Sequence, residues 1–261
     1  MDLSALTPST ILVFLLMLIR ISGLILATPL FSQTQIPMQV KVGFMATLTL
    51  ILYPIYKPAQ AVVATDLWQV ALLGIQELVI GLIIGFLVRL VFNAVEMAGT
   101  LVSQQMGLAM AQSFNPFSQN QSAGMGQLYF ILAATLFLTL NVHHTVIVAL
   151  AKSFELVPLV DGAALIQTNI LIERLLVMGS TMFITALLLA FPVFGILITL
   201  EVALAYTAKV MPQMNMFIVS LPFKIWIGLV LMLITMPFVM ELVGHQFGDL
   251  ATVLPKLYQF R

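Results

Sequence analysis

The sequence predicts an all-α fold, a multi-helix integral membrane protein built of helical hairpins. First, 61% of the residues are hydrophobic and only 8% are charged, whereas a soluble domain typically carries about 25% charged residues. Second, several apolar segments are long enough to cross a bilayer. Third, short breaks rich in proline and turn-forming residues separate these segments, which is typical of hairpins rather than of a few long rods.

The predicted helices follow from hydropathy averaged over a window of about 19 residues. Roughly six segments stand out by this measure. In chain order they are Thr10–Ala27, Val42–Tyr56, Leu67–Phe92, Leu128–Leu150, Leu175–Tyr206 and Phe217–Val243. Because proline lacks a backbone N–H and restricts the residue before it, we expect breaks at the prolines between and near the ends of these segments. These are Pro29, Pro37, Pro54, Pro58, Pro158, Pro212 and Pro222.

Two of the segments fit a simple membrane span poorly. Val42–Tyr56 is short for a crossing, and Leu175–Tyr206 is too long for one. The longer segment contains Phe191-Pro192, which should kink it or divide it into a hairpin. No part of the chain has the composition of a separate soluble domain.

The distribution of lysine and arginine does not decide the topology. The predicted loops on the two sides carry similar numbers of these residues, so the positive-inside rule gives little asymmetry. Either the sequence is simply ambiguous, or the helices do not cross the bilayer in the ordinary way and many are buried in an oligomer.

A long uncharged stretch is the most informative feature of the chain. Residues 97–151 include no Asp, Glu, Lys or Arg over 55 positions. Its centre, 104–122, is rich in amides, hydroxyls, glycine and methionine. Such a segment can neither face hydrocarbon nor pack as a soluble core, because its amides need partners. We expect it to line or fill a space inside a membrane assembly, where Met106 and Met110 serve either as ordinary packing or as a deformable seal.

Ionisable residues within the apolar segments form a second pattern. Glu77, Gly81, Gly85 and Arg89 are spaced by four, so they run along one side of a helix. The glycines allow a neighbouring helix to approach closely, and the charges at either end can pair across that contact. Two interpretations stay open: a structural seam of ion pairs, or a direct role in proton or ion passage. Both apply equally to Arg20, Glu201, Lys209 and Lys224.

The sequence contains no convincing sign of catalysis or of a cofactor. His143 and His144 are adjacent, so on a helix they point about 100° apart and do not chelate one metal as an i, i+4 pair does. The chain has no cysteine, and it shows no phosphate-binding loop or nucleophile elbow. The net charge is zero, which gives no indication of nucleic-acid binding. We predict no catalytic, metal or cofactor site.

Taken in order, the motifs of the chain resemble those of the FliR/SctT family, the export-gate subunits of flagellar and injectisome type III secretion systems. The resemblance covers essentially the whole chain. Its most specific part is the Pro-Gln-x-Asn run at 212–215, before the last apolar segment. The other matching motifs are Arg20, Thr28-Pro29-Leu30-Phe31, Ile36-Pro37 with Lys41, Glu77 with Gly81 and Gly85, Gln105-Met106-Gly107, Asn115-Pro116, Leu140-Asn141-Val142-His143-His144, Ser153-Phe154 with Pro158, Ala190-Phe191-Pro192 and Leu221-Pro222-Phe223-Lys224-Ile225.

The resemblance implies a subunit of the flagellar protein export channel, not an enzyme. It implies a closed helical assembly with FliP and FliQ, together with FlhB and FlhA, in the bacterial inner membrane at the flagellar basal body. About 1–170 is similar to FliP, with a plug loop at 104–127, and about 171–261 is similar to a FliQ hairpin. Other partners it implies are unfolded export substrates and membrane lipid, but no nucleic acid.

In that family a loop from this subunit plugs the closed pore, and the loop corresponds to about Gln105 to Gln121 here. A seal that opens for an unfolded chain needs weak, replaceable contacts, which phenylalanine, methionine and amides supply. A secondary transporter or ion-coupled carrier is the alternative, because broken helices and intramembrane charges also occur there. The plug residues implied are Gln105, Met106, Gly107, Met110, Phe114, Asn115, Pro116 and Phe117.

Overall fold

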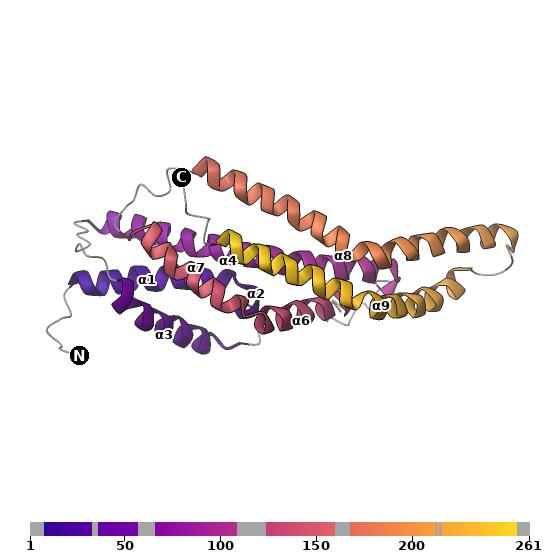
Figure 1. Ribbon diagram of the computed structural model, residues 1–261, viewed down its shortest axis with the longest axis horizontal. Coiled ribbons are helices and arrows are strands. Elements are labelled where there is room, and N and C mark those ends of the chain that lie inside the picture. The colour runs from indigo at the N-terminus through magenta and orange to yellow at the C-terminus, as the bar shows by residue number, and fades with distance from the viewer. Residues whose placement is uncertain are drawn as a thin grey trace. The chain divides into compact units, whose positions relative to one another are not determined.

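The structure is a computed structural model that describes residues 8–32, 36–56, 66–108, 124–159, 168–211, 213 and 216–254. Helices are the only regular secondary structure in these ranges, which confirms the all-α prediction (Figure 1). The chain divides into two compact units. One unit comprises Met1–Leu90, Asn141–Met178 and Gly248–Arg261, and the other comprises Val91–Leu140 and Gly179–Phe247.

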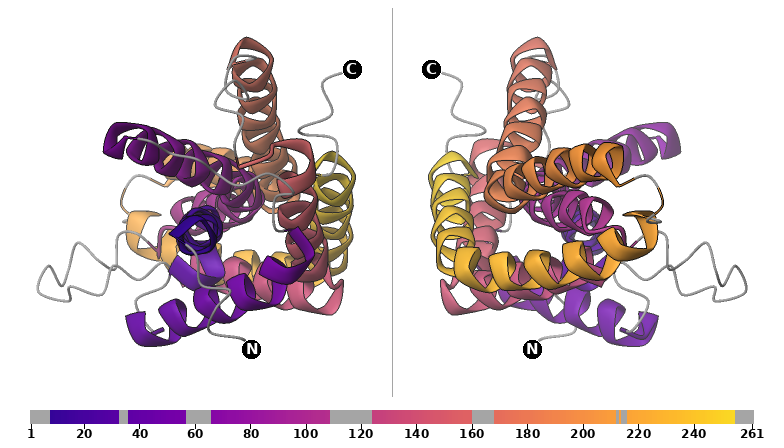
Figure 2. Two further views of the ribbon diagram at one scale, coloured as in Figure 1. Left: turned by 90° about the vertical axis from the view of Figure 1, so that its left-hand side faces the viewer. Right: turned by 90° about the vertical axis from the view of Figure 1, so that its right-hand side faces the viewer.

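The first unit is organised around helix α1 (Pro8–Ala27). Helix α3 (Met38–Tyr56) and the N-terminal half of α4 (Leu67–Gln105) pack against α1, and α7 (Val142–Leu156) contacts α3 (Figure 2). Buried residues on α1 recur three and four positions apart, so they form one apolar face. They include Val13, Leu16, Met17, Ile21, Leu24 and Ile25.

The junction after α1 follows from local chemistry. The Thr28 N–H and hydroxyl both donate to the carbonyl of Leu24, at 3.0 and 2.8 Å, so this carbonyl of the last turn is doubly paired. Proline then opens the short helix α2 (Pro29–Ser32), where a missing N–H costs nothing. The predicted break at Pro54 is wrong, because α3 continues through this residue.

The second unit contains the C-terminal part of α4, α6 (Gly124–Thr139), and most of α8 (Thr168–Val210) and α9 (Met216–Val253). Its aromatic core brings together rings from α4, α6 and α9. The rings of Phe92, Phe130, Phe137 and Phe247 lie with centroids 5.4–5.6 Å apart in the measured pairs. Pairs at this separation add to the apolar burial that holds the three helices together.

Two predicted segment boundaries are wrong for reasons visible in the structure. Helix α4 continues beyond Phe92 to Gln105, because Val95, Ala98 and Val102 keep a fully buried apolar face among the polar residues. The segment predicted as Leu128–Leu150 is two helices, α6 and α7. Asn141 separates them with a φ of 55°, a left-handed conformation that asparagine tolerates better than most residues do.

Helix α8 is a single helix of 43 residues with Pro192 inside it. Of the two outcomes predicted at Phe191-Pro192, a kink or a division into a hairpin, the division does not occur, and Figure 1 shows α8 bending about midway along its length. The break after α8 is where the sequence predicted it: α8 ends at Val210 and α9 begins at Met216. Pro222 and Pro237 lie inside α9 rather than at its ends.

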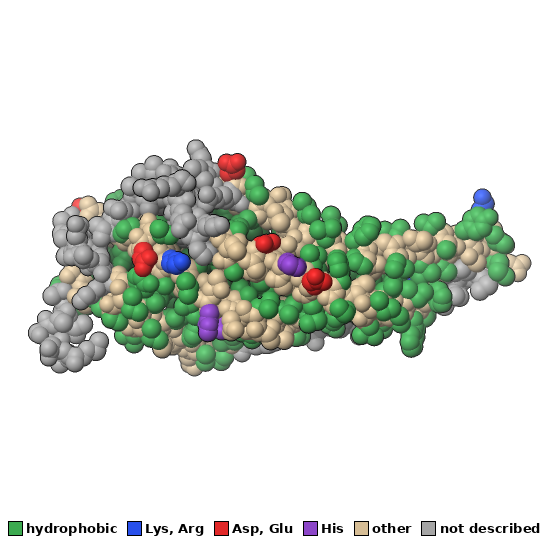
Figure 3. All heavy atoms as spheres, in the orientation of Figure 1, with side chains coloured by type: hydrophobic (Ala, Val, Ile, Leu, Met, Phe, Trp, Pro, Cys, Tyr) green, Lys and Arg blue, Asp and Glu red, His purple; other side chains and the backbone are tan. Residues whose placement is uncertain are grey.

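The described helices are suited to a membrane. Five of them are long and apolar enough to cross it, or up to six if α6 and α7 together form one broken span. On the face shown in Figure 3, charged side chains are few and scattered among apolar ones. Large apolar side chains are exposed along α8, including Phe183, Ile184, Leu187, Leu188 and Phe191. The chain is a multi-pass membrane protein whose outer surfaces fit lipid or other apolar helices.

Candidate functional site

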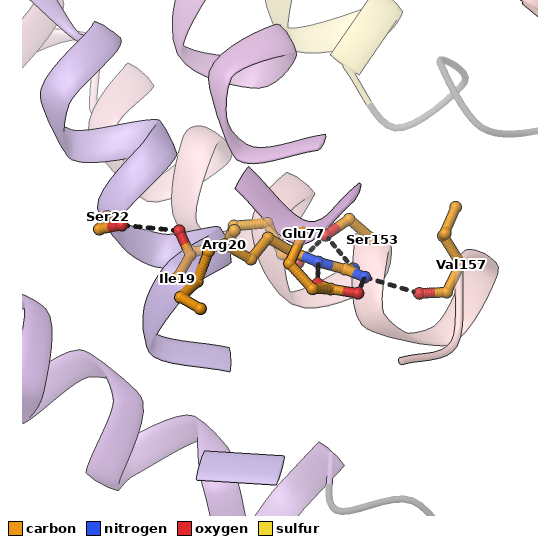
Figure 4. Close-up of polar contacts among 7 residues, drawn as sticks. Ile19, Arg20, Ser22, Glu77, Ser153 and Val157 are labelled. Atoms are coloured by element: carbon orange, nitrogen blue, oxygen red, sulfur yellow. Dashed lines mark hydrogen bonds and ion pairs between the residues drawn. The ribbon is translucent and has the colours of Figure 1, made fainter. Parts of the chain in front are cut away.

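A buried polar cluster joins three helices of the first unit (Figure 4). Arg20 on α1 donates to both carboxylate oxygens of Glu77 on α4, from Nε at 2.5 Å and from Nη2 at 3.0 Å. Its Nη1 donates to Ser153 Oγ at 3.1 Å, and Nη2 also donates to the Val157 carbonyl at 2.9 Å. The Phe154 ring lies 4.4 Å from the guanidinium carbon. α1, α4 and α7, together with the residue after α7, therefore all contact this guanidinium.

The cluster is closed to solvent and well satisfied. The side chains of Arg20 and Glu77 are both 0% exposed. A buried ion pair of this kind needs excellent geometry and further hydrogen bonds to offset its desolvation, and the fork-like contact with the carboxylate supplies both. Of the two interpretations that the sequence left open, this geometry favours a structural ion pair over a path for protons.

The glycines after Glu77 let α1 approach the backbone of α4. A Cβ at Gly81 would overlap the Arg20 carbonyl, and a Cβ at Gly85 would lie 2.7 Å from the Leu24 carbonyl oxygen. The approach is reciprocal, since a Cβ at Gly23 on α1 would lie 2.6 Å from the carbonyl oxygen of Leu78. The neighbouring helix that the glycine spacing indicated is thus α1 of the same chain.

The remaining charges of the predicted seam lie elsewhere. Arg89, at the far end of the stripe, is exposed and lies outside the cluster around Arg20. Lys209 is exposed near the end of α8. Glu201 and Lys224 form an ion pair between α8 and α9, with Lys224 Nζ 2.8 Å from Glu201 Oε1. The predicted seam therefore consists of two separate ion pairs, and Arg89 and Lys209 belong to neither.

Replacing Arg20 with leucine is expected to destabilise the first unit by about 3–5 kcal/mol, because Glu77 is left buried without a counter-ion. Thermal unfolding of the purified protein in detergent measures the effect. Lys152→Leu on α7 is the matched control, since Lys152 is exposed. The double variant Arg20→Leu/Glu77→Leu should regain much of the loss, because no charge remains buried. A single variant as stable as the parent would contradict a structural role for the pair.

A second group of contacts surrounds the end of α4, at the start of the predicted plug loop. Gly107 has a φ of +79°, and its N–H donates to the Gln104 carbonyl at 3.0 Å. A left-handed glycine at this place ends a helix and satisfies its last carbonyls. A Cβ at Gly107 would lie 2.9 Å from Leu221 Cδ2 on α9. The chain therefore leaves α4 directly against α9.

Met106 packs tightly at the same place. Its side chain is 0% exposed, and a Cβ at Gly228 would lie 2.6–2.8 Å from its Cγ, Sδ and Cε. Of the two roles left open for Met106, packing is therefore what this chain shows. The other predicted plug residues, Met110, Phe114, Asn115, Pro116 and Phe117, lie outside the described residues.

The last residue of α4 also makes a polar contact. Gln105 Nε2 donates to Glu201 Oε2 at 2.7 Å, while Glu201 Oε1 accepts from Lys224. Glu201 therefore uses its two oxygens to connect α4 and α9 through α8. Gln105 was predicted in the plug, whereas Glu201 and Lys224 were predicted in the seam, and no spacing in the sequence indicates that the three meet.

Some residues of both groups carried little or no signal in the sequence. Ser153, Phe154 and Leu221 appear only inside motifs of the family resemblance, while Val157 acts through its backbone carbonyl, which residue type does not reveal. No motif or spacing in the sequence indicated Gly228. For the histidines, the His143 and His144 rings lie 4.4 Å apart. Within the described residues no group of three or more His, Cys, Asp or Glu is placed to hold a metal ion.

Comparison with known proteins gives a consistent result over nearly the whole chain. Residues 11–250 match the family of bacterial export proteins, family 1. The chain is 30% identical over 237 residues to the flagellar biosynthetic protein FliR of Escherichia coli K12, covering 91% of this chain and 89% of that protein. It is 32% identical over 238 residues to FliR of Pectobacterium carotovorum, covering 90% and 88%.

A relative with a different name matches as well. The chain is 27% identical over 203 residues to the Yop proteins translocation protein T of Yersinia pestis, covering 78% of this chain and 76% of that protein. The family match over residues 11–250 includes every residue described in the contacts around Arg20 and Glu201. The chain therefore belongs to the bacterial export proteins of family 1, the FliR/SctT family.

Proposed function

We propose that this chain is a subunit of the flagellar type III protein export channel. In this proposal it forms, with FliP and FliQ, the gated pore through which unfolded flagellar proteins are secreted during flagellum assembly. The names of the relatives support the setting, since they are flagellar biosynthetic and translocation proteins. The exposed apolar faces of α3, α8 and α9 support an assembly in the inner membrane, in which other helices or lipid cover them.

The two-part organisation is also a proposal. We assign about 1–170 to a FliP-like part and about 171–261 to a FliQ-like hairpin. Support for the second part is that α8 and α9 account for almost all of it and are joined by the ion pair of Glu201 and Lys224. FlhB and FlhA are the further partners at the basal body.

The central part of the proposal is that the loop between α4 and α6 plugs the closed pore. The observation that carries it is the direct contact of the two helices that flank the loop. A Cβ at Gly99 on α4 would lie 2.6 Å from the Met125 carbonyl oxygen and 2.9 Å from the Gly126 Cα on α6. Helices that touch backbone to backbone need no loop to hold them together, so residues 109–123 are available for another task.

The composition of the loop suits a reversible seal. Phe114 and Phe117 supply apolar contacts that exclude water and ions. Gln112, Asn115 and Gln119 offer amides that can exchange their partners for substrate backbone or water. With no fixed charge in residues 97–151, the segment has no strong preference for one substrate sequence. The chain contains no nucleotide-binding motif, so we propose that it is not an enzyme and that partners supply the energy.

The test of the assembly is purification of the tagged chain from membranes in mild detergent. We expect it to elute with two other small hydrophobic subunits, which mass spectrometry should identify as FliP and FliQ. An unrelated multi-pass protein with the same tag, taken through the same detergent, is the control for non-specific recovery. Elution of the chain alone from an export-competent strain would count against the channel and favour a carrier that works by itself.

A further inference from the structure

We infer that Glu201 is a positioning residue that attaches the end of α4 to the α8–α9 hairpin and thereby sets where the following loop begins. The inference rests on the proposed plug function, which it deepens by naming what holds the base of the plug. It is built only on described residues of the second unit, which are Gln105, Met106, Gly107, Glu201, Leu221, Lys224 and Gly228.

One face of α9 receives the end of α4. Leu221, Lys224 and Gly228 are separated by three and four positions, so they lie on the same side of that helix. Leu221 meets Gly107, and Gly228 makes room for Met106. These two contacts are apolar and close, and they fix how near α4 comes to α9.

Glu201 adds directional hydrogen bonds, which the apolar contacts between α4 and α9 do not provide. Its Oε2 accepts from Gln105 and its Oε1 accepts from Lys224. Hydrogen bonds to a charged acceptor are short and strongly directional, so the carboxylate specifies the rotation of the last turn of α4. Apolar side chains alone would allow that turn to rotate or slide.

Burial shows why a carboxylate is needed at this place. The Lys224 side chain is 13% exposed, whereas that of Glu201 is 54% exposed. A mostly buried ammonium within an apolar hairpin needs a counter-ion, and Glu201 supplies it from α8. Gln105 then shares that counter-ion without adding charge of its own.

Glu201 also uses separate oxygens for its two contacts, Oε2 for Gln105 and Oε1 for Lys224. One contact can therefore break while the other stays. A buried pair such as Arg20 and Glu77 cannot separate without losing its unit's core. The hydrogen bond from Gln105 to Glu201 can break while Lys224 keeps its counter-ion. The end of α4 can therefore be released without unfolding the α8–α9 hairpin.

The test measures the junction and the seal separately. The chain has no cysteine, so Met106→Cys/Gly228→Cys introduces a single pair. A Cβ at Gly228 would lie 2.6 Å from Met106 Cγ, so the two Cβ atoms would be at most about 4 Å apart, close enough for a disulfide. The initial rate of disulfide formation in the purified complex reports how often the end of α4 is seated. Leakage of ions through the membrane, measured without the cysteines, reports the seal.

Glu201→Ala is expected to shift the ratio of seated to released α4 ends about fivefold toward release, the change that corresponds to ~1 kcal/mol, so disulfide formation slows and the leak rises up to about fivefold. Glu201→Lys/Lys224→Glu should restore both readouts, because the ion pair re-forms with reversed polarity. The side-chain oxygen Oε1 of Gln105 can then accept from the new lysine. Glu241→Gln, an exposed glutamate on α9, is the matched control and should change neither readout.

An unchanged disulfide rate in Glu201→Ala would overturn the inference. So would a leak that rises in Glu201→Ala without rescue by the reversed pair. A leak that stays at the parental level in Glu201→Ala, in a strain where shortening the loop does cause leakage, would also overturn it. If shortening the loop causes no leakage, the plug proposal fails. The disulfide rates then decide alone whether Glu201 positions the end of α4.

Discussion

Trimming a few residues between Ala111 and Ser118 leaves the export assembly intact and raises the permeability of the membrane to ions and small solutes. This is the expected result if residues 109–123 are a plug. The flanking helices touch at Gly99 and Gly126 without help from the loop, so assembly should not depend on loop length. Burying one phenylalanine contributes roughly 1.5–3 kcal/mol, so losing the contacts of Phe114 and Phe117 should increase the leak at least about tenfold.

A pair of substitutions separates loop length from loop chemistry. Phe114→Ser/Phe117→Ser keeps the length and removes the apolar contacts, whereas Gln112→Ser/Gln119→Ser keeps both phenylalanines. The phenylalanine variant should raise the permeability of the membrane, and the glutamine variant should raise it much less. Conductance or growth inhibition is measured beside co-purification of the complex. Loss of assembly in the trimmed variant would show that the loop is a strut, and an intact complex without added leak would refute the plug.

Replacing Gly81 with leucine is expected to prevent α1 from packing on α4. A Cβ at this position would overlap the Arg20 carbonyl, and backbone atoms on both sides leave no flexible group to move aside. We expect a loss of at least ~3 kcal/mol, together with disruption of the Arg20–Glu77 pair. Recovery of monodisperse protein and of the complex should fall sharply, and motility should be lost.

Gly43→Leu on α3 is the matched control for the glycine experiment. It is also helical and in the first unit, but nothing lies within 4 Å of a Cβ there. This variant should be recovered normally. Gly85→Leu should behave like Gly81→Leu, because its Cβ would lie 2.6 Å from the Cβ of Ala27. Normal yield and motility in both Gly81 and Gly85 variants would contradict the close packing of these two helices.

Hydropathy predicted the positions of the helices well, but it predicted their ends poorly. The hydropathy averaged over a window falls where polar residues begin, so the apolar segment of α4 was predicted to end at Phe92. The helix continues because Val95, Ala98 and Val102 still face the interior of the second unit. Conversely, the uniform hydropathy of 128–150 concealed the break at Asn141, which depends on the backbone conformation of one residue. Proline did not consistently mark the ends of helices, because α8 and α9 both continue through proline residues.

The candidate site was predicted in its parts but not in its pairings. The spacing of Glu77, Gly81 and Gly85 indicated a close helix contact, since four-residue periodicity is a local property of one helix. The identity of the partner is not local: Arg20 lies 57 residues before Glu77. Gln105 lies 96 residues before Glu201. Contacts at such separations depend on how helices pack, which periodicity in a single sequence does not specify.

The contacts of Arg20 also impose an order on membrane insertion. α1 is synthesised first, whereas the two acceptors of the Arg20 guanidinium lie 57 and 137 residues further along the chain. At about 5–20 residues per second, the second acceptor emerges on the order of 7–30 s later. An arginine within a lone helix costs at least ~2.5 kcal/mol in the bilayer. Until Glu77 is made, about 3–11 s after Arg20 at the same rate, α1 needs protection from lipid, which an insertase or a neighbouring protein can supply.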